Sequence, residues 1–203
     1  MERKCSELDK TLEYYNKNAK EFVEGTLNAD MSVLYTMFRK YVPSGSVILD
    51  MGCGSGRDTK YFSGQGYTVV AMDGSEELCK LAENYTGQEV LCMAFNELDA
   101  VEQFDGIWAC SSILHVPKDD LPDILHRIQR ALKLGGYLYA SFKYGAFSGN
   151  RNGRYFTDLT EDQFAHILDA VGGFEVIESF VSKDVRVGRA DEKWLNLFLK
   201  RTK

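Results

Sequence analysis

The chain has 203 residues, a formal net charge of −6 and 44% hydrophobic residues, values typical of one globular domain in solution. The acidic charge argues against a general affinity for nucleic acid phosphates, and no apolar run is long enough to cross a membrane. The polar start MERKCSELDK differs from a secretory signal, so we expect a cytoplasmic protein with no membrane partner. The five cysteines form no CxxC pair, which predicts reduced thiols and no metal site.

The first part of the chain has helical periodicity. Residues 7–41 predict two helices with a break near Gly25. Tyr14 and Tyr15 belong to the first of these helices, where they either pack in the core or close over a site. We expect residues 1–42 to form a helical cap on the rest of the chain.

The rest of the chain alternates between two patterns. Short apolar runs bounded by turn residues predict buried strands, and amphipathic segments between them predict helices. The strand candidates are residues 46–51, 67–72, 89–94, 104–110 and 136–142, and the clearest helix candidates are residues 75–85, 121–132 and 160–171. Strands that are buried on both faces and alternate with helices indicate a parallel sheet with right-handed crossovers.

The last third of the chain departs from this alternation. Residues 174–181 and 194–199 are two strand-like runs with only a loop between them, so they should pair antiparallel at one edge of the sheet. The predicted fold is an α/β, Rossmann-like, doubly wound and mostly parallel seven-stranded sheet, with an antiparallel C-terminal hairpin and helices on both faces. Residues 1–203 form one domain, in which residues 43–203 are the Rossmann-like core.

A glycine-rich turn follows the first predicted strand, in the stretch VILDMGCGSGRDTKYF. Glycines allow a positive φ and a close approach of the backbone, and a helix N-terminus offers free N–H groups, so this turn predicts a small-molecule cradle. Asp50 precedes the turn, and Asp73 ends the next strand, where a carboxylate can accept two hydrogen bonds from a ribose diol. The alternatives are glycines required for steric reasons alone and an Asp73 that only forms a turn before Gly74.

The spacing of the glycines, G-x-G-x-G, differs from the G-x-G-x-x-G of dinucleotide sites. VILDMGCGSGRDT resembles the first motif of the class I S-adenosylmethionine-dependent methyltransferases, and YTVVAMDGS resembles their second. FDGIWACSSILHVPKDD and LKLGGYLYASF are similar to their fourth-strand and fifth-strand segments, and YYNKNAKEF to the opening helix of many members. The similarity covers essentially the whole chain. Among subgroups, the chain most resembles compact single-domain enzymes grouped with tellurite-resistance and small-molecule methyltransferases.

The resemblance implies S-adenosyl-L-methionine as cofactor and S-adenosyl-L-homocysteine as product. The glycine turn and Asp50 would hold the amino-acid end of the cofactor, Asp73 the ribose, and Phe95 the adenine ring, with Asn96 or a backbone N–H at the ring edge. The family often has an acidic residue near the end of the third strand, where this chain has Ala94. The cofactor-binding candidates are Tyr15, Asp50, Gly52, Cys53, Gly54, Gly56, Arg57, Asp73, Gly74, Phe95, Asn96 and Cys110.

His115 follows the fourth strand and is the candidate general base, unless it only caps the loop or packs. Four arginines fall in two non-helical segments, GNRNGRYF and VRVGR, and arginine is suited to binding carboxylate or phosphate. The alternative is that nearby carboxylates pair with these arginines and fix the loops. The substrate-binding candidates are His115, Lys143, Tyr144, Arg151, Arg154, Arg186 and Arg189.

Three functions follow from this interpretation. The first is a methyltransferase, monomeric or homodimeric, acting on a small acceptor that the arginines suggest to be anionic; a thiol or metalloid acceptor stays open. The second is an RNA or protein methyltransferase, against which the net charge of −6 counts. The third is a cofactor-binding protein without catalysis, or a nicotinamide-dependent enzyme.

Overall fold

The computed structural model describes residues 7–186, 188–189 and 191–203. The helices are α1 (Glu7–Thr26), α2 (Ser32–Tyr41), α3 (Arg57–Gly64), α4 (Glu76–Thr86), α5 (Leu121–Ala131) and α6 (Glu161–Val171), with short 3-10 turns η1 (Phe95–Glu97) and η2 (Ile113–His115). The strands are β1 (Val47–Met51), β2 (Thr68–Asp73), β3 (Val90–Cys92), β4 (Phe104–Ala109), β5 (Leu132–Lys143), β6 (Ser148–Arg151), β7 (Arg154–Thr157), β8 (Phe174–Lys183) and β9 (Lys193–Arg201). None of these described helices is both long and apolar enough to span a membrane.

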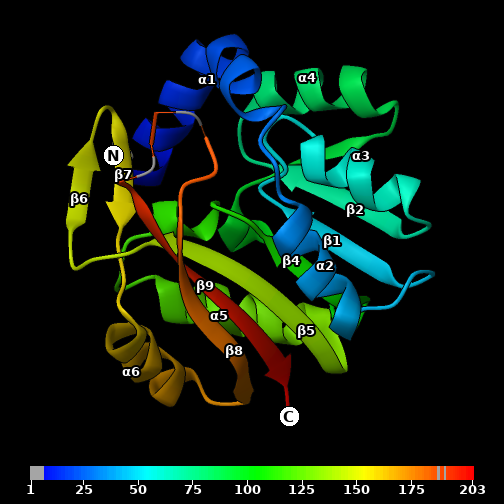
Figure 1. The fold of residues 1–203 in the computed structure, drawn as a ribbon, viewed down its shortest axis with the longest axis vertical. Helices are drawn as coiled ribbons and strands as arrows, with labels where there is room; N and C mark the ends of the chain where they lie inside the picture. The colour runs from blue at the N-terminus through cyan, green and yellow to red at the C-terminus, as the bar shows by residue number, and fades with distance from the viewer. Residues whose placement is uncertain (1–6, 187, 190) are drawn as a thin grey trace, which may run out of the picture.

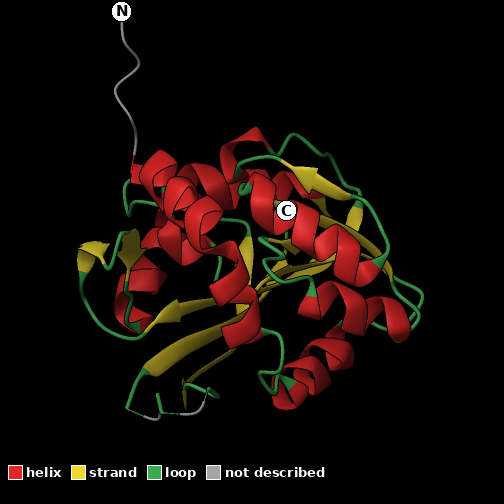
Figure 2. Cartoon of the chain, turned by 90° about the horizontal axis from the view of Figure 1, so that it is seen from above, coloured by secondary structure: helices red, strands yellow, loops and turns green. Residues whose placement is uncertain are grey.

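A seven-stranded sheet in the order β3-β2-β1-β4-β5-β9-β8 forms the centre of the molecule (Figure 1). The first five strands in that order pair parallel, whereas β9 pairs antiparallel with both β5 and β8. Figure 2 shows the helices packed around this twisted sheet. The predicted α/β fold with an antiparallel C-terminal hairpin is therefore confirmed.

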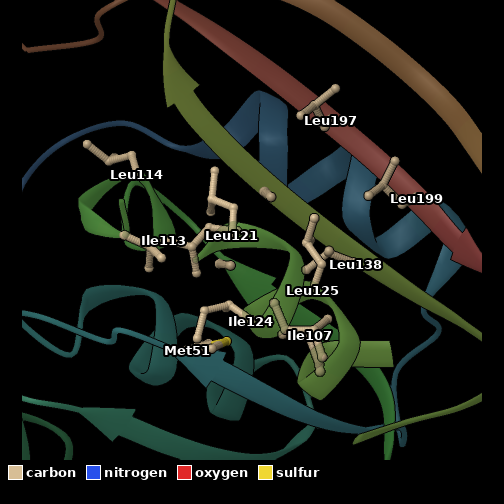
Figure 3. Close-up of a cluster of buried hydrophobic side chains, with 14 of the residues drawn as sticks. Met51, Ile107, Ile113, Leu114, Leu121, Ile124, Leu125, Leu138, Leu197 and Leu199 are labelled. Atoms are coloured by element: carbon tan, nitrogen blue, oxygen red, sulfur yellow. The ribbon is translucent and has the colours of Figure 1, made fainter. Parts of the chain in front are cut away.

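Alternating side chains of the central strands divide the core into two clusters. Leu49, Ile107 and Leu138 belong to the cluster that contains the apolar residues of α5 and α6, part of which is drawn in Figure 3. Their neighbours Ile48, Trp108 and Tyr139 belong to the cluster that contains apolar residues of α2 and α3. Because successive strand residues point to opposite faces, this alternation places helices on both faces of the sheet.

The predicted helix ends agree with the structure where side chains cap them. Ser75 accepts a hydrogen bond from the backbone of Leu78 at the start of α4. Thr160 and Gln163 form a capping box at the start of α6. The first helix ends at Thr26, so the predicted break near Gly25 is confirmed.

The arginine-containing segment predicted as a non-helical loop forms a two-stranded hairpin, β6–β7. Its turn is Asn152-Gly153, and both residues have a positive φ, 51° and 80°. Asn-Gly is the preferred pair for such a tight turn. The fifth strand is also longer than predicted, because β5 begins at Leu132, directly after α5.

Four of the five cysteines lie in the described residues, and all four, Cys53, Cys79, Cys92 and Cys110, are free. The remaining one, Cys5, lies outside the described residues, as does the rest of the segment 1–6 of the predicted cap. Within the described part of that cap, α1 packs against α4 and against β7 (Figure 1). This helix therefore joins the carboxyl edge of the sheet to the β6–β7 hairpin.

Candidate active site

The glycine turn between β1 and α3 requires glycines because of its backbone conformation and its packing against neighbouring side chains. Gly52, Gly54 and Gly56 have φ values of 80°, 55° and 75°. A Cβ added to Gly52 would lie 2.4 Å from the Cβ of Ser112, and one added to Gly54 would lie 3.0 Å from the ring of Phe22. Backbone conformation and close packing are thus sufficient to require these glycines, so their presence alone does not identify a ligand.

Two pockets adjoin at the carboxyl ends of the central strands. The larger has a volume of about 470 Å³ and the smaller about 60 Å³. Their linings share residues of α1, the glycine turn and the segment after β4, which are Tyr15, Phe22, Gly52, Gly54, Ser111 and His115. A ligand that occupies both pockets would therefore pass between Tyr15 and the glycine turn.

The smaller pocket combines a carboxylate, an aromatic ring and an unpartnered hydroxyl. Asp73, at the end of β2, accepts hydrogen bonds of 2.9 Å from the backbone N–H groups of Gly54 and Ser75, and burial raises the pKa of its carboxyl group. The half-buried ring of Phe95 lies in the same lining. Ser112 Oγ is buried and has no hydrogen-bond partner among the described residues. These groups offer both polar and stacking contacts to a ligand.

Two buried carboxyl groups lie near the glycine turn in different protonation states. Asp50 is 2% exposed and accepts a hydrogen bond of 2.5 Å from Thr59 Oγ1, and burial raises its pKa to about 8. Asp58, in the first turn of α3, accepts bonds from Arg57, Tyr35 Oη and Trp108 Nε1. Although burial opposes ionisation, the ion pair with Arg57 keeps the pKa of Asp58 below its ordinary value. Asp58 borders the larger pocket, whereas Asp50 does not.

Tyr15 and His115 form a hydrogen-bonded pair where the two pockets meet. Tyr15 Oη lies 2.8 Å from His115 Nε2, and His115 Nδ1 lies 2.6 Å from the backbone carbonyl of Tyr155. Burial lowers the pKa of His115 to about 4 and raises that of the Tyr15 hydroxyl. Both groups are therefore neutral near pH 7. Burial also raises the pKa of the neighbouring Cys110 thiol to about 12, so that thiol is protonated as well.

Three of the four predicted arginines form ion pairs with nearby carboxylates. Arg151 pairs with Asp158 at 2.6 Å, and Arg189 with Glu192 at 3.7 Å. Arg186 donates to both carboxylate oxygens of Asp184, at 2.9 and 2.6 Å. Lys143, at the end of β5, also pairs with Asp184 and Glu192. These pairs stabilise the loops at this edge of the sheet, as the alternative interpretation expected.

Arg154 is different from the other three. Its guanidinium lies over the rings of Tyr14, Phe156 and Tyr15, at 4.7, 5.2 and 5.6 Å from their centroids. Its Nη1 donates to Tyr15 Oη at 3.3 Å, and it makes no ion pair with a carboxylate of the described residues. Arg154 Nε and Asp158 Oδ1 are both buried atoms that lack a hydrogen-bond partner in the described part of the chain. Both side chains border the larger pocket.

Most of the predicted site residues border one or both pockets. Those in the lining of the larger pocket are Tyr15, Gly52, Cys53, Gly54, Arg57, Cys110, His115, Lys143, Tyr144, Arg151, Arg154, Arg186 and Arg189. Those in the smaller lining also include Asp73, Gly74 and Phe95. Asp50, Gly56 and the exposed Asn96 border neither.

Sequence reasoning did not single out two residues of the linings, Phe22 and Asp58. Asp58 had a recognisable signal, because an acidic residue in the first turn of a helix after a glycine turn is favourably placed by the helix dipole. Phe22 had none, since only the folded chain brings it against the glycine turn.

The fold is a Rossmann-like domain with two pockets at the carboxyl ends of its strands, and comparison with known proteins shows which proteins it is similar to. Residues 49–140 match the family model described as methyltransferase domain. The chain is 25% identical to a 1,6-didemethyltoxoflavin-N1-methyltransferase from Burkholderia thailandensis, solved with 1,6-didemethyltoxoflavin and S-adenosylhomocysteine. That alignment has a TM-score of 0.74 and covers 95% of this chain and 85% of the other.

Two curated relatives match parts of the chain. Methyltransferase GfsG from Streptomyces halstedii is 30% identical over 106 residues, which cover 48% of this chain and 37% of GfsG. The probable S-adenosyl-L-methionine-dependent methyltransferase TehB from Haemophilus influenzae is 27% identical over 95 residues, 44% of this chain and 33% of TehB. The chain thus matches less than half the length of these relatives. Over the matched residues, the chain is similar to S-adenosylmethionine-dependent methyltransferases.

Proposed function

We propose that the chain transfers a methyl group from S-adenosyl-L-methionine to a small acceptor. The observation that carries this proposal is the meeting of two unlike pockets at Tyr15 and His115. One pocket has the groups that suit a nucleoside, and the other has the volume of about 470 Å³ that is usual for a small-molecule site. The bound cofactor supplies an electrophilic methyl group, and its sulfur leaves as a neutral thioether.

The residues of the smaller pocket suit the adenosine end of this cofactor. Asp73 would accept hydrogen bonds from the ribose hydroxyls, Phe95 would stack on the adenine, and the unpartnered Ser112 hydroxyl would gain a partner. The Arg57–Asp58 ion pair offers both charges that a zwitterionic amino-acid end requires. We favour Asp58 over Asp50 for the ammonium group, because Asp58 is the ionised carboxylate that borders the pocket.

Helix α1 covers the smaller pocket. Leu12 lies against Gly74, with its Cδ2 2.8 Å from the position of an added Cβ, and Phe22 lies against Gly54. A volume of about 60 Å³ is too small for a nucleoside, since ligand pockets usually measure roughly 300 to 1,000 Å³. Entry of the cofactor therefore requires side chains of α1 to withdraw from the edge of the sheet.

The acceptor that we propose is a small anion. Arg154 is the support for this choice, because it is partly buried among aromatic rings, borders the larger pocket and has an unpartnered Nε. A buried guanidinium without a carboxylate partner is costly unless a ligand completes its hydrogen bonds. The paired Arg151, Arg186 and Arg189 are less suited to this role.

Two experiments test the proposed function. Calorimetric titration with S-adenosylmethionine, S-adenosylhomocysteine and NAD should give binding of the two sulfur nucleotides and none of NAD. Incubation of cell extract with methyl-labelled S-adenosylmethionine, with and without the protein, should then place new label in the low-molecular-mass fraction. Binding of NAD alone would contradict the cofactor, and label confined to RNA or protein would contradict the small acceptor.

A further inference from the structure

The geometry points to Tyr15 as a catalytic residue that relays a proton from the methyl acceptor to His115 Nε2. This inference rests on the proposed function and assigns Tyr15 a role other than cofactor contact. It also restricts the acceptor to one whose reacting atom carries a hydrogen, that is, a hydroxyl, a thiol or a protonated nitrogen.

The tautomer of His115 follows from its two partners. The Tyr155 carbonyl can only accept a hydrogen bond, so His115 Nδ1, at 2.6 Å, must carry the proton and donate it. Burial keeps the imidazole neutral near pH 7, so Nε2 has a free lone pair. The contact of 2.8 Å with Tyr15 is therefore a bond in which the tyrosine hydroxyl donates to Nε2. His115 thus has no free position from which to take a proton directly from a substrate.

The hydroxyl oxygen of Tyr15 has room for one further partner. A tyrosine hydroxyl donates one hydrogen bond and has lone pairs with which to accept others. Its proton is directed to His115 Nε2, and Arg154 Nη1 donates to it at 3.3 Å. Tyr15 borders both pockets, so an X–H group in the larger pocket can reach the remaining acceptor position.

The proton movement balances as follows. The acceptor's X–H bond breaks, its proton passes to Tyr15 Oη, and the original proton of Tyr15 passes to His115 Nε2. The acceptor atom retains the electron pair with which it takes the methyl group. His115 ends as an imidazolium that still donates from Nδ1 to the Tyr155 carbonyl, and it returns its proton to solvent after product release.

The charges around the pair act on this transfer in a definite direction. Arg154 on β7 faces both groups, so it stabilises negative charge that develops on Tyr15 Oη during the transfer and disfavours the imidazolium. Tyr14 on α1, Asp73 on β2 and the ion-paired Arg186 are further charged or titratable groups that interact with Tyr15, and Phe156 on β7 packs its ring against His115. An anionic acceptor bound at Arg154 would offset its charge and favour protonation of His115.

Tyr15→Phe tests the relay because it keeps the ring contacts with Phe22 and His115 while removing the hydroxyl. Transfer of label from S-adenosylmethionine to the low-molecular-mass fraction of cell extract should fall by about 10²- to 10⁴-fold. Affinity for S-adenosylhomocysteine should stay within about twofold, since the ring remains. The rate that is left should rise with pH, because the acceptor must then lose its proton to solvent. Tyr61→Phe, which removes the exposed hydroxyl bonded to Arg39, is the matched control and should transfer label normally.

A second measurement does not depend on turnover. Ring ¹⁵N spectra of His115 should show a protonated Nδ1 and a bare, hydrogen-bonded Nε2, whose resonance moves downfield in Tyr15→Phe. A protonated Nε2 in the wild-type protein, or normal label transfer by folded Tyr15→Phe, would overturn the relay. If the wild-type protein did not bind S-adenosylhomocysteine, the proposed function itself would be overturned instead, so the two failures can be distinguished.

Discussion

The raised pKa of the buried Asp50 carboxyl group, beside the glycine turn, can be tested through the pH dependence of stability. In an unfolded chain its pKa is about 3.9, whereas burial beside Asp58 raises it to about 8 in the folded protein. Between these values the folded state holds a proton on Asp50 that the unfolded state has lost. The free energy of unfolding therefore falls as pH rises through this window, by about 1.4 kcal/mol per pH unit at most.

Asp50→Asn removes this titration without changing the shape of the side chain. The amide oxygen can still accept the hydrogen bond of 2.5 Å from Thr59 Oγ1. Relative to wild type, the variant should gain stability as pH rises from 5 to 7, by an upper limit of roughly 3 kcal/mol. In a protein of this size, that corresponds to a relative change in Tm of roughly 5 to 10 °C.

Thermal unfolding followed by circular dichroism between pH 5 and 8 measures this difference. Asp105→Asn is the matched control, because Lys133 and the Val47 backbone bind the Asp105 carboxylate and lower its pKa despite partial burial. Its difference from wild type should be constant over the same range. If Asp50→Asn showed a constant difference from wild type, or lost stability relative to wild type as pH rises, Asp50 would already be ionised and the reason for preferring Asp58 beside the cofactor's ammonium group would be removed.

Three further outcomes are expected. Gly52→Ala should lose about 1 to 3 kcal/mol of stability in denaturant titration because its Cβ would lie 2.4 Å from another side chain, whereas Gly25→Ala, with open space around it, should gain roughly 0.5 to 1 kcal/mol. Asp73→Ala should weaken calorimetric S-adenosylhomocysteine binding by about 1 to 3 kcal/mol, or roughly five- to 150-fold; unchanged affinity in a folded variant would contradict the ribose contact. Arg154→Gln should reduce methyl transfer while leaving cofactor affinity unchanged, whereas Arg186→Gln should lower Tm by breaking its ion pair; the reverse pattern would contradict the proposed acceptor site.

The central sheet could be predicted because its strands are buried on both faces and its helices are amphipathic. Residues 46–51, for example, form an apolar run between turn residues, and β1 occupies Val47–Met51. The β6–β7 hairpin was harder to predict, since its strands are only four residues long and mostly polar. The Asn152-Gly153 pair was the available signal, and the flanking sequence lacks the apolar alternation that usually accompanies it.

The arginines show what the sequence could not settle about the acceptor site. Each of the four lies near a carboxylate along the chain, so spacing alone allows every one of them to be paired. Folding pairs Arg151, Arg186 and Arg189 and turns Arg154 toward the rings of α1 instead. The difference arises from the alternation along β7 and from the packing of α1 on that strand, neither of which is encoded in the local sequence around the arginine.

The contact between Tyr15 and His115 also arises from the fold and not from local sequence, and the proposed proton transfer depends on it. These residues are 100 positions apart, on a helix that precedes the sheet and on a turn after β4, and the hairpin supplies both the Tyr155 carbonyl and Arg154. Leu12, which covers Gly74, and Tyr15 both lie before the kink of α1 at Asn18, so a movement of that half of the helix that withdraws Leu12 also moves Tyr15 relative to His115. Cofactor entry and assembly of the proton path would then be coupled, so the acceptor could lose its proton only when α1 has returned to the edge of the sheet. Ring ¹⁵N spectra of His115 with and without S-adenosylhomocysteine would detect this coupling as two distinct Nε2 environments, and an unchanged resonance would show that α1 returns Tyr15 to the same place in both states.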